Sequence, residues 1–189
     1  MHVSLPQRGI HVKTLTKKSI RPLRSGERGV ALGELAIILP LLLVVLLGII
    51  DLGRLVSGYQ TLNDLSREAA NLVSRGASMD SAVAAIGLSN TGPVDVVGHG
   101  AIIISTLTRR SAGDSTPWVV DQFRSGSISG SASRVGSEGG PARMPNVDAL
   151  ETGVTVMAVE VVHGFVPLFP VEAFGLDIYP EVLYEAAFF

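Results

Sequence analysis

The most apolar stretch of the chain lies near its amino end. Residues 35–50 are sixteen consecutive apolar or small residues, and counting back to Val30 gives twenty-one, with Glu34 as the only charge. At about 1.5 Å per residue, a helix of this length spans a hydrocarbon core of roughly 30 Å. The pattern predicts a transmembrane helix over residues 30–51. Pro40 lies inside it, and membrane helices tolerate proline where neighbouring helices satisfy the freed carbonyl.

Beyond the span the apolar residues become sparser, but their spacing stays helical. They recur every three or four positions, which places them in one stripe, and charged or amide side chains lie between them. The stripe consists of Leu52, Leu55, Val56, Tyr59, Leu62, Leu65, Ala69, Leu72 and Val73. Gly76 is the kind of residue that ends a helix. We therefore predict an amphipathic helix over residues 52–76 that continues the span, so that residues 30–75 form one helix.

Residues 77–189, called the head below, contain short segments, some with the pattern of a helix and others with the pattern of a strand. Residues 80–86 have the pattern of a short helix. Segments rich in β-branched residues predict strands over 101–108, 118–123, 154–162 and 176–185. Residues 125–142 contain eleven Gly or Ser among eighteen, which predicts a flexible surface loop. The predicted fold class is α+β, with a long N-terminal helix and a small head built on an antiparallel sheet.

Charge divides the chain at the start of the span. Up to Gly29 there are seven Lys or Arg and one acid, a net +6, whereas from Val30 onward eight basic residues face sixteen acidic ones, a net −8. A basic flank before an apolar span stays in the cytoplasm, so we predict a basic leader over residues 1–29 and a head on the opposite side of the membrane. An acidic exported part argues against a nucleic-acid partner. Cysteine is absent, which excludes disulfides and thiolate metal sites.

The polar residues form no recognisable catalytic set. The four histidines are scattered, and none has a second histidine or a carboxylate at a metal-ligand spacing. We expect His99 and His163 on a loop or a strand surface. Glu160 stands among valines, and we interpret it as facing solvent or pairing with an arginine such as Arg109 rather than as a catalytic carboxylate. The sequence therefore predicts no catalytic residue, no metal site and no cofactor, and the chain is not expected to be an enzyme.

The residues before the span have the order of a processing site. In GVALGELAIILP the basic leader is followed by Gly29, four residues, Glu34 and the apolar helix. This order resembles the site at which a prepilin peptidase cuts type IV pilin-like proteins after the glycine. The resemblance implies cleavage between Gly29 and Val30, and it implies that Glu34 of one subunit pairs with the new α-ammonium group of a neighbour.

The similarity extends through about fifty residues, to the end of the amphipathic helix. The segment resembles the N-terminal part of TadE-like minor pseudopilins of the tight-adherence (Tad or Flp) type IV pilus. The matching positions are Gly29, Glu34, Leu39, Pro40, Leu41, Gly48, Asp51, Gly53, Arg54, Ala69 and Ala70. Within this family Pro40 and Gly48 are expected to serve helix kinking and packing, and a pilin-like fold is implied.

The resemblance also implies a function and a set of partners. The chain is expected to be a structural or assembly component of an adhesive bacterial pilus, held in the inner membrane by one span with its head in the periplasm. The extracellular pilus is a second location, and the sequence leaves open whether the subunit enters the fibre, its tip or only its base. The implied partners are the prepilin peptidase, other pilin and pseudopilin subunits, the pilus assembly platform and membrane lipid. Two alternatives remain: a permanently anchored periplasmic domain, and an exported hydrolase. The mature N-terminus separates them, since Val30 indicates the pseudopilin, Met1 the permanent anchor, and a residue near Tyr59 the hydrolase.

Overall fold

The computed structural model describes residues 25–89, 94–111, 113–114, 116–128, 133–147, 150–169, 175 and 178–189. The chain divides into two compact units, Met1–Leu42 and Leu43–Phe189. The first 24 residues of the predicted leader lie outside the described residues.

A single helix, α1 (Ser25–Ser74), contains both the predicted span and its amphipathic continuation. It begins five residues before Val30, since no proline interrupts the chain there, and it runs through Pro40. The predicted stop is confirmed at its other end. Gly76 has a φ of 90°, and the N–H groups of Gly76 and Ala77 donate to the carbonyls of Val73 (2.9 Å) and Leu72 (3.1 Å). These two bonds are the Schellman pattern that satisfies the last carbonyls of a helix.

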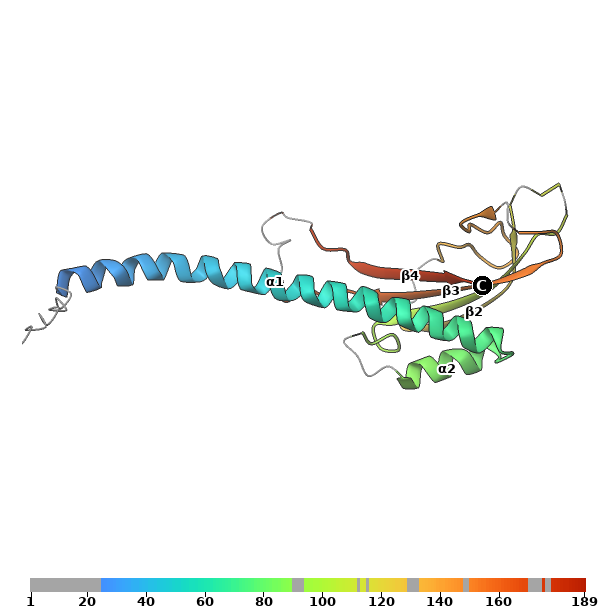
Figure 1. Ribbon diagram of the computed structural model, residues 1–189, viewed down its shortest axis with the longest axis horizontal. Coiled ribbons are helices and arrows are strands. Elements are labelled where there is room, and N and C mark those ends of the chain that lie inside the picture. The colour runs from blue at the N-terminus through green and yellow to red at the C-terminus, as the bar shows by residue number, and fades with distance from the viewer. Residues whose placement is uncertain are drawn as a thin grey trace, which may run out of the picture. The chain divides into compact units, whose positions relative to one another are not determined.

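The head contains a short helix and one sheet. The helix is α2 (Met79–Ser89), and the strands are β1 (Gly100–Thr108), β2 (Trp118–Gly126), β3 (Thr155–Gly164) and β4 (Val182–Phe188). The sheet, drawn as arrows in Figure 1, has the order β2-β1-β3-β4, and all neighbouring strands are antiparallel. The α+β fold class with an antiparallel sheet is therefore confirmed.

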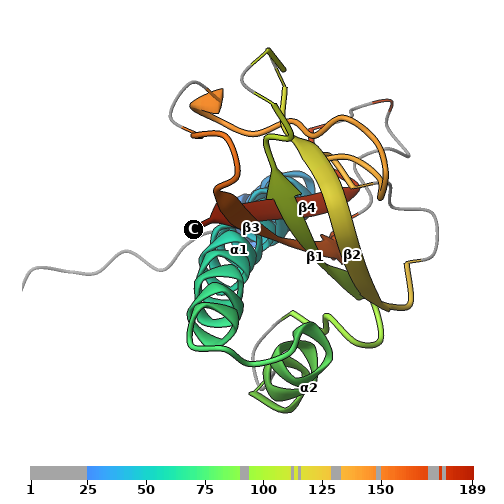
Figure 2. The ribbon, with the colours of Figure 1, turned by 90° about the vertical axis from the view of Figure 1, so that its right-hand side faces the viewer.

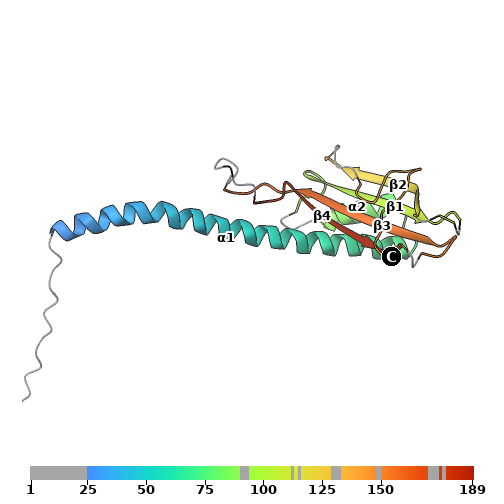
Figure 3. The ribbon, with the colours of Figure 1, turned by 90° about the horizontal axis from the view of Figure 1, so that it is seen from above.

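Both helices cover the same face of the sheet (Figure 2). The core on this face joins residues 62–70 of α1 and residues 82–86 of α2 to alternating side chains of β1, β3 and β4. Figure 3 shows the second half of α1 running alongside β4. A smaller apolar cluster lies on the other sheet face, where Val135 and Ala142 of the β2–β3 connection pack on Leu107 and Val119.

The predicted stripe of α1 faces this core only in part. Leu55, Leu62, Leu65, Ala69, Leu72 and Val73 pack into it or against it. Leu52, Val56 and Tyr59, in contrast, are exposed. These three residues follow each other at intervals of four and three, so they form a second line on the helix that continues the apolar surface of the span.

Three predicted strand boundaries were wrong by three residues or more. The second strand continues to Gly126 because its backbone stays paired with β1, up to the Ala101↔Gly126 pair, so Ser125 and Gly126 belong to the sheet and not to the loop predicted for 125–142. The last strand begins at Val182 and not at residue 176. Pro180 has no N–H group to donate to a ladder, and the pairing with β3 starts only at the Gly164↔Val182 pair. The last strand continues to Phe188 and not to residue 185, because its backbone stays paired with β3 up to the Ala158↔Phe188 pair. Residues 129–132 of the predicted loop lie outside the described residues.

Candidate functional site

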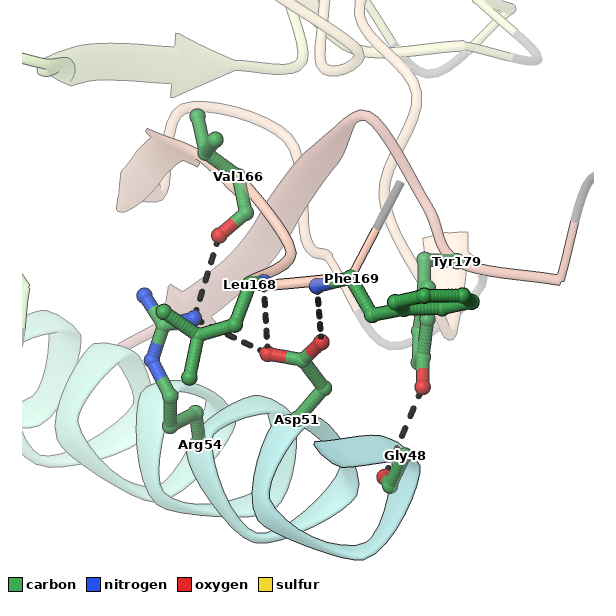
Figure 4. A network of polar contacts seen from close by, with 7 residues as sticks. All are labelled: Gly48, Asp51, Arg54, Val166, Leu168, Phe169 and Tyr179. Atoms are coloured by element: carbon green, nitrogen blue, oxygen red, sulfur yellow. Dashed lines mark hydrogen bonds and ion pairs between the residues drawn. The ribbon is translucent and has the colours of Figure 1, made fainter. Parts of the chain in front are cut away.

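A buried carboxylate lies on α1 directly after the apolar run. Asp51 has no exposed surface, and its two oxygens accept hydrogen bonds from the backbone N–H groups of Leu168 (2.9 Å) and Phe169 (3.0 Å). Figure 4 shows the carboxylate pointing from the helix at these two groups, which lie in the connection between β3 and β4. A carboxylate that loses its water needs such donors, because burying it unpaired is costly.

Arg54 completes the contact one turn further along the helix. Its Nη1 donates both to Asp51 Oδ1 (3.0 Å) and to the carbonyl oxygen of Val166 (3.2 Å). Its guanidinium carbon lies 5.7 Å from the centroid of the Phe165 ring. One helical turn before Asp51, the carbonyl oxygen of Gly48 accepts a hydrogen bond from the Tyr179 hydroxyl at 3.5 Å (Figure 4).

We call this set the junction: Gly48, Asp51 and Arg54 on α1, with Val166, Leu168, Phe169 and Tyr179 on the β3–β4 connection. The helical members are three residues apart, a spacing that makes side chains neighbours on one helix face. Apart from the Arg54–Asp51 pair, each of these bonds joins two residues that are more than 110 positions apart in the sequence. The junction therefore ties the β3–β4 connection to the part of α1 where the apolar run ends.

The sequence contained a signal for the junction that was not used to predict a site. Gly48, Asp51 and Arg54 are three of the positions that carry the resemblance, and an acid directly after an apolar run with an arginine three residues later is an i, i+3 pair. Their partners at residues 166–169 are mostly apolar and contribute backbone groups. No side-chain pattern marks a backbone partner, which is why the site was missed.

The residues predicted to serve cleavage and assembly lie on α1. Val30, Glu34 and Pro40 are exposed, and there is open space around Gly29. Gly48 lies in the second unit and accepts the Tyr179 hydrogen bond, so the structure gives it a place in the junction. The roles assigned to Gly29, Val30, Glu34 and Pro40 stay predictions.

The interpretation of Glu160 was wrong. Its side chain is fully buried on the sheet face opposite α1, and it accepts hydrogen bonds from the Arg134 N–H (2.8 Å), the Val135 N–H (3.2 Å), the Tyr184 hydroxyl (2.8 Å) and the Ser133 hydroxyl. Burial and the bond to Glu160 raise the pKa of the Tyr184 phenol, so this group stays a donor.

Arg109, which had been considered as the partner of Glu160, instead donates to the carbonyl oxygens of Asp114 (2.9 Å) and Leu150 (3.1 Å). The physical role of Glu160 is to hold residues 133–135 of the β2–β3 connection against the sheet.

The two described histidines lie near each other beside a cavity of about 260 Å³. His99 is on a surface loop as predicted, and its side chain is 76% exposed. Its Nδ1 lies 3.2 Å from Oδ2 of Asp95, which is four residues earlier, so the interpretation that no histidine has a carboxylate at a metal-ligand spacing was wrong. His163 is on β3 but half-buried, and burial lowers the pKa of its ring below the usual value. In the described part of the chain, no three His, Cys, Asp or Glu side chains are grouped so as to hold a metal ion.

The fold and the junction define an α+β chain whose N-terminal helix, within the described residues, is long and apolar enough to cross a membrane. Residues 29–71 match the family model described as TadE-like protein, which confirms the resemblance over this segment and relates the chain to Tad pilus systems. Neither the curated proteins nor the solved structures contain a match. The match begins at Gly29 and includes the helical half of the junction.

Proposed function

We propose that the chain is a minor pseudopilin, a structural or assembly component of a Tad type IV pilus. The observation that carries this proposal is the TadE-like match over residues 29–71, which begins at the glycine of the expected cut and extends along a helix that continues through the span. The small antiparallel head after the helix agrees with a subunit that presents a folded domain outside the membrane.

The proposed location is the bacterial inner membrane, with one span and the head in the periplasm. The seven basic residues before Val30 support a cytoplasmic N-terminus. In this arrangement the span is surrounded by lipid, the assembly platform receives the subunit from the membrane, and the other pilin and pseudopilin subunits pack against its exposed apolar helix. Incorporation into the extracellular fibre completes the proposal.

Cleavage after Gly29 requires that the backbone at this position leave the helix. Gly29 lies inside α1, four residues after its start. Glycine destabilises a helix interior by roughly 0.5–1 kcal/mol relative to alanine, so a peptidase can unwind the first turns of α1 more readily with glycine at positions 29 and 33 than with alanine there. Glycine also lets the backbone come close to the catalytic carboxylates of an aspartyl peptidase.

The test is the mature N-terminus of the membrane form. In a strain with the prepilin peptidase, intact mass and N-terminal sequencing are expected to give a chain beginning at Val30. The Gly29→Val variant is expected to accumulate as the full-length precursor, whereas Gly33→Ala, which changes a glycine just after the cut, is expected to be processed. A parent chain that keeps Met1 would support the permanent anchor, and equal cleavage of Gly29→Val and the parent would contradict the proposed processing.

A further inference from the structure

Three large apolar side chains are exposed among the described residues of the β3–β4 connection. Val166 is 74% exposed, Leu168 is 56% exposed and Ile178 is 62% exposed. Apolar residues scattered singly on a surface need no explanation, but a group of them on one connection marks an interaction site. The question is which partner covers them.

The junction fixes the position of these side chains along the axis of α1. Residues 166, 168 and 169 bond to Asp51 and Arg54, and Asp51 directly follows the last residue of the apolar run, Ile50. With a rise of 1.5 Å per residue, the connection lies within about one helical turn, roughly 5 Å, of the end of that run. At the same level Ile49, Ile50 and Leu52 of the helix are exposed as well. Val166 and Leu168 thus expose apolar side chains at the level where the apolar run of α1 ends. Ile178 directly precedes Tyr179, whose hydroxyl donates to the Gly48 carbonyl, so it lies close to this level as well.

Among the described residues of the junction, the buried carboxylate at this level is paired. Asp51 is fully buried by the connection, and the N–H groups of Leu168 and Phe169 are used up by its carboxylate. Arg54 keeps its side chain 41% exposed, as a long cationic side chain does when its stem is apolar and its head reaches water. An uncompensated carboxylate would oppose contact with lipid, and the junction removes that obstacle.

We propose that residues 166–169 and Ile178 of the β3–β4 connection lie in the lipid interface next to α1, with the side chains of Val166, Leu168 and Ile178 in contact with the bilayer. The partner is therefore lipid, and the connection forms a second, shallow membrane contact that sets the height and orientation of the head. Apolar side chains placed at the boundary of headgroups and acyl chains gain binding energy from the area that they bury. This inference rests on the proposed membrane anchoring by α1.

The natural absence of cysteine allows single-cysteine variants of the full chain to carry an environment-sensitive fluorophore. The chain is reconstituted in phosphatidylcholine vesicles, and each probe is exposed to spin-labelled lipid and, separately, to iodide in water. The test positions are Leu168→Cys and Ile178→Cys. Leu43→Cys reports on the span, and Val154→Cys is an exposed apolar control just before β3. Val154 lies roughly 30 Å along the strand from the junction, at about 3.3 Å per residue.

The spin-labelled lipid is expected to quench the probes at 43, 168 and 178 by about twofold or more, and iodide is expected to quench only the probe at 154. Quenching at 43 with iodide-accessible probes at 168 and 178 would overturn the inference and leave the anchor intact. Probes at 168 and 178 shielded from both quenchers would show that a second protein chain covers the connection, which also overturns it. A probe at 43 that lipid does not quench would remove the proposed anchor itself.

Discussion

At the scale of single residues, two buried carboxylates hold the two connections around β3. Asp51 binds backbone N–H groups of the β3–β4 connection, and Glu160 binds those of the β2–β3 connection. Each carboxylate accepts bonds from two backbone N–H groups in addition to its bonds from side chains. Hydrogen bonds to charged groups are stronger than neutral ones, and a donor left without its acceptor in a buried place costs about 1–3 kcal/mol. Each carboxylate therefore adds polar anchoring to a connection that also packs apolar side chains against the sheet or α1.

This arrangement predicts how Glu160 variants unfold. Glu160→Ala leaves four donors without their acceptor and is expected to lower the free energy of unfolding by about 3 kcal/mol, whereas Glu160→Gln keeps one acceptor oxygen and is expected to lower it by about 1 kcal/mol. Urea unfolding of the purified chain in detergent, followed by Trp118 fluorescence, measures both. Glu138→Ala, an exposed acid in the same connection, is the control and is expected to stay within about 0.5 kcal/mol of the parent. An alanine variant as stable as this control would contradict the anchoring role.

At the scale of elements, the end of α1 shows how backbone geometry selects a residue. Gly76 and Gly53 both have open space where a Cβ atom would stand, but Gly76 has a positive φ and Gly53 lies inside the helix. Gly76→Ala is expected to destabilise the chain by roughly 1–2 kcal/mol because of the left-handed backbone. Gly53→Ala is expected to stabilise it by about 0.5–1 kcal/mol through helix propensity. Thermal unfolding of the two variants should shift in opposite directions, and shifts of the same sign would show that φ does not decide the outcome at Gly76.

The sequence predicted the elements well where a side-chain pattern repeats. It predicted them poorly where backbone pairing between strands sets the boundary of an element. The span, the amphipathic continuation, the stop at Gly76 and the segment of β1 followed from periodicity and turn residues. The end of β2 and both ends of β4 did not, because backbone pairing with β1 and β3 sets those boundaries and not the side chains. The order of residues that resembles a processing site was likewise visible in the sequence, where it stays a prediction. The junction and the Glu160 network were not visible, because they depend on N–H groups that carry no side-chain signal.

At the scale of the whole molecule, the position of Glu34 separates a local role from an assembly role. In the precursor Glu34 is nine residues after the start of α1, so the dipole of the helix, which acts within the first turn, gives it little there. Cleavage before Val30 would bring Glu34 close to a new helix end, where the dipole is worth about 0.3–1 kcal/mol. An unpaired charge inside a span costs roughly 2.5–3.5 kcal/mol, which exceeds this gain. We therefore propose that the α-ammonium group of Val30 on a neighbouring subunit pairs with Glu34.

The corresponding prediction concerns Glu34→Gln in a piliated strain. Loss of the charge is expected to leave membrane insertion and head folding unchanged, to permit at least some cleavage after Gly29, and to weaken co-purification with pilus subunits, because the neighbour's ammonium group loses its partner. Glu68→Gln, an exposed acid on the same helix beyond the span, is the matched control and is expected to co-purify like the parent. Cleavage is followed by intact mass, subunit binding by co-purification and fibre formation by electron microscopy. If Glu34→Gln is cut normally, binds its partners as strongly as Glu68→Gln and supports full piliation, Glu34 acts only at the end of its own helix and does not pair between subunits.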